Sequence, residues 1–227
     1  CRIVHQRHEK LIPHSESCFC IRYGQMKGLL LKDYYLIKSV LYIILVVFAV
    51  VGIGMSFLTS TWVLTVIATV MLGMISVTTI NMDRNSGWKK VSLVLPVSRT
   101  AALDCKYVLY LLLSGIGLLL GVILGVVASI IKGQIDYQSM MLFVGISVAM
   151  ALFSGSMTIP LTFLLSEEKS MLALIIAYPL SAFVFVGAAL LIDNKLLACG
   201  LVTIVGVLLY AISWLISRKQ IINKDMT

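Results

Sequence analysis

Charged residues are scarce in this chain. They make up 12% of its 227 residues, whereas hydrophobic residues make up 60% and the mean hydropathy is +1.03. A soluble domain usually carries about a quarter charged residues and about half apolar ones. The composition therefore excludes an ordinary soluble globular protein and predicts an integral membrane protein.

Ionisable side chains are missing from the long apolar runs. A bilayer core of about 30 Å needs about 20 helical residues, and six runs are of this order: 40–58, 62–80, 107–131, 140–165, 171–192 and 196–216. None of them contains Asp, Glu, Lys, Arg or His, the residues that ion-coupled carriers usually keep at membrane depth. We predict an all-α membrane protein with six transmembrane helices and no catalytic residue.

Signatures of metal and nucleotide binding are also missing. All three histidines precede residue 15, and Cys18 and Cys20 stand closer together than the cysteines of a zinc pair. The chain has no Gly-x-x-x-x-Gly-Lys-Ser/Thr loop, which cradles nucleotide phosphates. We therefore expect no metal site and no cofactor in this chain, free thiols that serve as packing residues, and an energy source outside it.

The first 25 residues differ from the rest. They contain no apolar run and lack the hydrophobic stretch of a signal peptide, whereas Met26 opens a sequence typical of the start of a bacterial membrane protein. We expect residues 1–25 to be a non-native extension or a disordered tail, and residues 26–227 to form a single six-span domain. In residues 27–39, Leu30, Tyr34 and Ile37 recur at helical spacing, which predicts an interfacial amphipathic helix before the first span.

The basic residues indicate the orientation. Sixteen of the eighteen Lys and Arg residues lie before the first span, after the last one, or in the connections 81–106 and 166–170. Because cytoplasmic loops are enriched in Lys and Arg, we place both termini and these connections in the cytoplasm. The net charge of +8 is thereby explained by topology, and we expect the lipid bilayer rather than nucleic acid as a partner.

Small residues mark two helical faces. Gly117, Gly121 and Gly125 recur every four residues in the third run, which predicts close approach of another helix. A second stripe in the second run is either a pathway or dimer face, or ordinary helix packing with hydroxyls bonded to the backbone; it comprises Thr65, Thr69, Gly73, Ser76 and Thr79.

Prolines and aromatic residues give two further expectations. Pro160 and Pro179 lie inside the fourth and fifth runs and should kink these helices. Four aromatic residues lie near the ends of the runs, where we expect them at the level of the lipid headgroups: Trp62, Tyr107, Tyr110 and Trp214.

The longest polar segment after Met26 is the connection 81–106. Trp88, Val91 and Leu95 lie on one face of a short predicted helix, Pro96 ends that helix, and Ser98 can cap the next one, which continues into the third span. A helix–break–helix with an aromatic residue and several cations suits docking on a soluble partner. The alternative is a basic loop that only fixes the topology.

The connection also resembles that of a known family. The residues Asp83, Gly87-Trp88, Leu95-Pro96-Val97-Ser98-Arg99 and Lys106-Tyr107 are similar in order to those of the permease subunits of type-2 ABC exporters. The segment that opens at Met26 is similar to the amphipathic helix of these proteins. The chain departs from the family at Arg84-Asn85-Ser86, where relatives often carry further acidic residues.

The resemblance implies a function. The segment would be a short cytosolic coupling helix between spans 2 and 3 that docks on a separate ATP-binding subunit, and its coupling residues would be Asp83, Gly87, Trp88, Lys89, Lys90, Leu95, Pro96, Val97, Ser98 and Arg99. ATP and Mg²⁺ would be bound by that subunit, and the permease would pair with a second copy or a paralogue. The resemblance further implies a non-catalytic subunit of the bacterial plasma membrane that exports an amphipathic or hydrophobic cargo, such as an antimicrobial peptide, a lipid or a drug. The alternatives are a non-transporting membrane interaction protein, such as an immunity or anchoring protein, and then a secondary transporter.

Overall fold

The structure is a computed structural model that describes residues 14–58, 62–88, 99–133, 136–165, 167–191 and 195–224. The described residues form six long α-helices: α1 (His14–Leu58), α2 (Val63–Asn85), α4 (Arg99–Lys132), α5 (Tyr137–Leu164), α6 (Glu167–Leu191) and α7 (Lys195–Lys224). The prediction of an all-α protein is confirmed.

Four of the helices are long and apolar enough to cross a membrane. These candidate spans are Val63–Asn85, Thr100–Lys132, Tyr137–Phe163 and Leu197–Ile221, and they overlap almost completely with the predicted spans that begin at residues 62, 107, 140 and 196. The predicted spans 40–58 and 171–192 fall on α1 and α6, where many side chains lie outside the described residues. Six transmembrane helices therefore stay a prediction.

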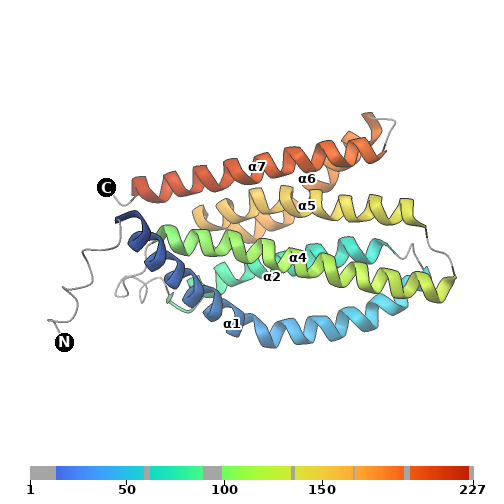
Figure 1. The fold of residues 1–227 in the computed structure, drawn as a ribbon, viewed down its shortest axis with the longest axis horizontal. Coiled ribbons are helices and arrows are strands. Elements are labelled where there is room, and N and C mark those ends of the chain that lie inside the picture. The colour runs from blue at the N-terminus through green and yellow to red at the C-terminus, as the bar shows by residue number, and fades with distance from the viewer. Residues whose placement is uncertain are drawn as a thin grey trace.

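Helix α1 is continuous from His14 to Leu58, and it joins the predicted interfacial helix to the predicted first span. Its N-terminal part crosses the bundle obliquely before the helix bends and runs along it (Figure 1). Residues 14–25 are part of this helix, and the prediction that residues 1–25 are an extension stays a prediction.

The helices are arranged as a bundle with α2, α4 and α5 between α1 on one side and α7 on the other (Figure 1). The start of α1, the end of α2, the start of α4 and the end of α7 lie at the same end of the bundle (Figure 1). We call this end the near end and the opposite one the far end. With 34 residues, α4 is about 51 Å long, so it is longer than a bilayer core is thick.

Two apolar clusters stabilise the bundle. One joins α1, α2 and α4 through Ile37, Leu72, Ile75, Leu109 and Leu113. The other joins α2, α4, α5 and α7, and its largest members are Tyr107, Tyr110 and Tyr210. Many large apolar side chains outside these clusters are exposed, for example Leu119, Ile123 and Ile130 of α4, as expected for helices that face lipid.

Candidate functional site

The predicted coupling segment is described at its two edges. Asp83, Gly87 and Trp88 lie at the end of α2, and Arg99 begins α4, as the predicted helix from Arg99 into the third span requires. Lys89, Lys90, Leu95, Pro96, Val97 and Ser98 lie outside the described residues. What the structure describes is therefore the anchorage of the segment on the bundle.

Helix α2 ends with a turn at Gly87. Ser86 caps the helix, its backbone N–H donating to the carbonyl of Met82, and Gly87 follows with φ at +69°. Glycine is the usual residue at this position because it adopts left-handed backbone conformations without a steric cost. The next residue, Trp88, lies with its ring centroid 4.2 Å from the Lys32 ammonium of α1, within the range of a cation–π contact.

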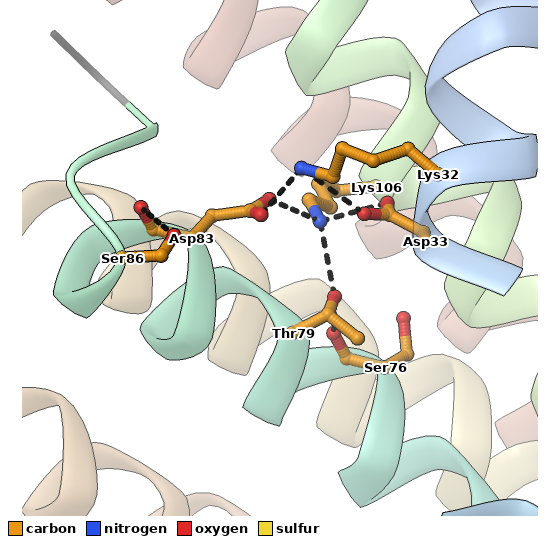
Figure 2. A network of polar contacts seen from close by, with 7 residues as sticks. All are labelled: Lys32, Asp33, Ser76, Thr79, Asp83, Ser86 and Lys106. Atoms are coloured by element: carbon orange, nitrogen blue, oxygen red, sulfur yellow. Dashed lines mark hydrogen bonds and ion pairs between the residues drawn. The ribbon is translucent and has the colours of Figure 1, made fainter. Parts of the chain in front are cut away.

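A cluster of four charged residues lies beside this turn (Figure 2). Lys32 and Asp33 come from α1, Asp83 from the last turn of α2, and Lys106 from the start of α4. We call these four residues the charge cluster. Because its members come from three helices, the cluster joins all three at the near end.

Lys106 is at the centre of the charge cluster (Figure 2). Its Nζ atom lies 2.7 Å from Oδ2 of Asp33 and 2.7 Å from Oδ2 of Asp83, and it donates to the Thr79 hydroxyl at 3.1 Å. An ammonium group has three protons to donate, so each of them has an acceptor. Lys32 forms ion pairs with Asp83 and, at 3.4 Å, with Asp33.

The charge cluster is buried and electrically neutral. Only 2% of the Asp33 side chain and 8% of the Lys106 side chain are exposed, against 15% for Asp83 and 22% for Lys32. A buried charge is costly unless it is paired, and removing one partner of a buried pair costs about 3–5 kcal/mol. Two lysines and two aspartates balance each other, so the cluster persists only as a matched set.

Arg84 connects the end of α2 to α5. Its Nη2 atom donates to the carbonyl oxygen of Thr162 at 2.6 Å, in the last turn of α5, where carbonyl groups lack partners within the helix. A cation is also favourable at a helix C-terminus. Consecutive residues, Asp83 and Arg84, therefore connect the end of α2 to α1 and α4 and to α5.

The two predicted small-residue faces pack within the chain. A Cβ atom on Gly117 would lie 2.6 Å from the carbonyl oxygen of Ala68, and one on Gly121 would lie 2.5 Å from Cα of Thr65. A Cβ on Gly125 would lie 3.0 Å from the ring of Trp62. Gly117 and Gly121 thus lie where α4 meets the backbone of α2 directly, and Gly125 lies against the Trp62 side chain.

The stripe of small residues on α2 is internal. Thr65, Thr69, Ser76 and Thr79 are at most 1% exposed, and Gly73 lies against the ring of Tyr110. Thr69 and Thr79 donate to carbonyl oxygens of their own helix, as in ordinary helix packing. A dimer face at the stripe stays a prediction, and the burial of these positions within one chain favours ordinary helix packing. A transport pathway along the stripe stays a prediction.

Three of the four aromatic residues expected at the headgroup level are buried within the bundle. Trp62 is 4% exposed, Tyr107 3% and Tyr110 1%. The Tyr110 hydroxyl donates to the carbonyl of Ala151 at 2.9 Å, and half-buried Trp214 donates to Asp104 of α4 at 2.7 Å. The polar tips of Tyr110 and Trp214 thus bond to neighbouring helices, and the headgroup level of the four aromatic residues stays a prediction.

Pro160 lies inside α5 as expected. Because proline has no N–H, the carbonyl four residues before it, that of Ser156, loses its helical partner. The hydroxyl of Ser213 on α7 donates to this carbonyl at 2.6 Å, and it also bonds to the hydroxyl of Tyr107 on α4 at 2.9 Å. The site of the missing hydrogen bond thereby joins α4, α5 and α7. Pro179 lies inside α6.

The described residues hold no group of His, Cys, Asp and Glu suited to a metal ion, and the free thiols of Cys105 and Cys199 are buried. The sequence interpretation did not identify Lys32, Asp33 and Lys106 as site residues. A signal was present, because Asp33 stands four residues from Leu29 and Ile37, on the face of α1 that is buried. An acidic residue at a buried helical position requires a cationic partner.

One comparison with known proteins gives a match to the sequence. A family profile described as ABC-2 family transporter protein matches residues 28–221. No curated protein and no solved structure matches the chain. The matched range contains the charge cluster and all four candidate membrane spans.

Proposed function

The chain belongs to the ABC-2 family of transporter membrane proteins, and we propose that it is the permease subunit of an ATP-driven exporter. The observation that carries the proposal is the family match over residues 28–221. In this role the chain is non-catalytic, spans the bacterial plasma membrane six times with both termini in the cytoplasm, and pairs with a second copy or a paralogue.

The proposed ATPase-docking region is the connection between α2 and α4. It lies at the near end, together with the described ends of α1 and α7 (Figure 1), and this end carries most of the basic residues. A cytosolic subunit that docks there would contact the segment after Trp88, and the residues that precede this segment contact α1, α4 and α5. ATP and Mg²⁺ would be bound by that subunit.

The proposed cargo is amphipathic or hydrophobic. The described parts of the candidate spans carry their charged residues close to the helix ends, and a pathway through the apolar middle would suit a cargo with little charge. An antimicrobial peptide, a lipid and a drug all have this character.

The docking role can be tested with two lysines of the proposed docking segment. Trp88 is unsuitable because it packs on Lys32, so we choose the double variant Lys89→Glu/Lys90→Glu. Lys219→Glu is the matched control, since Lys219 is an exposed lysine near the end of α7. The tagged protein is purified in detergent from its native membrane, and bound subunits are identified by mass spectrometry and by ATP hydrolysis.

We expect an ATP-binding subunit to copurify with the wild type and with Lys219→Glu, and to be lost from the double variant. Absence of any ATPase from the folded wild-type protein would contradict the proposal and favour a non-transporting membrane interaction protein.

A further inference from the structure

We propose that the charge cluster transmits ATPase-driven movement of the coupling segment to α1 and α4, with Lys32, Asp33 and Lys106 as its positioning residues. This inference rests on the proposed function and adds a route by which the docked subunit acts on the bundle.

The charge cluster contacts the coupling segment directly. Asp83 and Trp88 are separated by the turn at Gly87, and both contact Lys32 of α1. A displacement of Trp88 therefore changes the surroundings of the Lys32 ammonium directly. No apolar contact has to carry the movement, because the two side chains come from the segment itself.

Beyond Lys32, the ion pairs of the charge cluster link α1 to α4. Asp83 is shared between Lys32 of α1 and Lys106 of α4, and Asp33 is shared between the same two lysines. Each carboxylate thus bridges α1 and α4. If Asp83 moves with the end of α2, both lysines lose part of their compensation and must follow it or exchange acceptors.

Burial of the charge cluster makes the loss of an ion-pair partner unfavourable. Asp33 and Lys106 are almost completely shielded from water, so water cannot readily replace a lost ion-pair partner. A broken pair is therefore unfavourable, and the favourable response to movement of Asp83 is a joint movement of the three helix segments. An exposed pair would not act in this way, because exposed pairs contribute little.

Two double variants distinguish transmission of movement through the charge cluster from its contribution to the stability of the fold. Lys32→Met/Asp33→Asn removes both members on α1 and keeps the 2.7 Å pair between Asp83 and Lys106. Asp83→Asn/Lys106→Met removes the members on α2 and α4 and keeps the pair on α1. Both variants leave the charge cluster neutral, which avoids an unpaired buried charge. Lys38→Met, at an exposed lysine of α1, is the control.

The measurement is hydrogen–deuterium exchange of the permease–ATPase complex, without nucleotide and trapped with ATP and vanadate. In the wild type and in Lys38→Met, we expect trapping to change exchange in the coupling segment, in residues 27–39 of α1 and at the start of α4. In Lys32→Met/Asp33→Asn, the change in α1 should be lost while those in the segment and in α4 persist.

In Asp83→Asn/Lys106→Met, we expect the changes in α1 and α4 to be lost together. If Lys32→Met/Asp33→Asn does not fold, this second variant still tests the proposal. A wild-type response of α1 in a folded double variant would overturn the proposal and reduce the charge cluster to a structural element. A wild-type protein without a bound ATPase would overturn the proposed function itself, which is a different result.

Discussion

Helices α2 and α4 are held together by different chemistry at their two ends. Toward the far end, Gly117 and Gly121 bring the backbones into direct contact, and a single added carbon would overlap α2. At the near end, Lys106 reaches α2 through two polar side chains, Asp83 and Thr79. One interface excludes side chains, and the other is made by polar side chains.

The two ends should respond differently to force. Close-packed backbones gain many short-range contacts that are lost with small separations, so the far end has one favourable arrangement. An ion pair weakens gradually with distance, and an ammonium group can exchange one carboxylate for another. We therefore expect the far end to act as a fixed contact while the near end rearranges.

The variant Lys106→Met should have the largest effect on stability. It leaves Asp33 and Asp83 with only Lys32 as a partner, and removing one member of a buried ion pair costs about 3–5 kcal/mol. The free energy of unfolding in mixed detergent micelles measures this. Adding Asp83→Asn should restore most of the loss, because the remaining charges balance.

The matched control for this prediction is Lys38→Met, since Lys38 is an exposed lysine on α1. If Lys106→Met is no less stable than Lys38→Met, the near end is not held by the charge cluster.

The variant Gly121→Ala should have the next largest effect. Its Cβ atom would lie 2.5 Å from Cα of Thr65, so α4 must move away from α2, at a cost of about 1–3 kcal/mol. Gly115→Ala is the control on the same helix, because its Cβ would meet no atom within 4 Å. Alanine is the better helix former, so the control should be neutral or slightly stabilising.

Thermal unfolding monitored by fluorescence-detected gel filtration distinguishes the two glycine variants. Equal stability of Gly121→Ala and Gly115→Ala would show that the far end is as adaptable as the near end, and the contrast between them would disappear.

The sequence predicted the helices better than their contacts. Long uncharged runs identify spans because lipid cannot satisfy polar groups, and the spacing of Gly117, Gly121 and Gly125 indicated a close-approach face. The spacing could not identify α2 as the partner, because every helix of the bundle offers small residues. For the same reason the stripe at Thr65 and Thr69 was open to interpretation as a dimer face.

The charge cluster was harder to predict for a physical reason. Asp33 and Lys106 are 73 residues apart, and each lies next to a polar or basic stretch that is typical of a solvated segment. Periodicity reports which face of a helix is apolar, whereas a buried ion pair places charged residues on that face. Leu30, Tyr34 and Ile37 were therefore predicted as the apolar side of an interfacial helix, whereas the side of α1 that packs in the bundle includes Ile37 and the charged residue Asp33, and Tyr34 is 52% exposed.

A charge at the far end gives the smallest expected effect. Asp136 precedes α5, and its carboxylate accepts from the Ser139 hydroxyl at 2.6 Å and from the backbone N–H groups of Gln138 and Ser139. These bonds, that from the Ser139 hydroxyl foremost, lower the pKa of Asp136. Unlike the charge cluster, this group is exposed, so solvent replaces most of what a substitution removes.

The sign of its pH dependence follows from the lowered pKa. The folded state holds the proton less tightly than the unfolded state, so the contribution of Asp136 to stability is fully present above the unfolded pKa of about 4. It is lost as the pH falls through the folded pKa. Asn at this position also caps a helix but carries no charge. The difference in unfolding temperature between wild type and Asp136→Asn should therefore shrink on acidification below about pH 4, whereas parallel curves would mean that the charge at the far end contributes nothing to the fold.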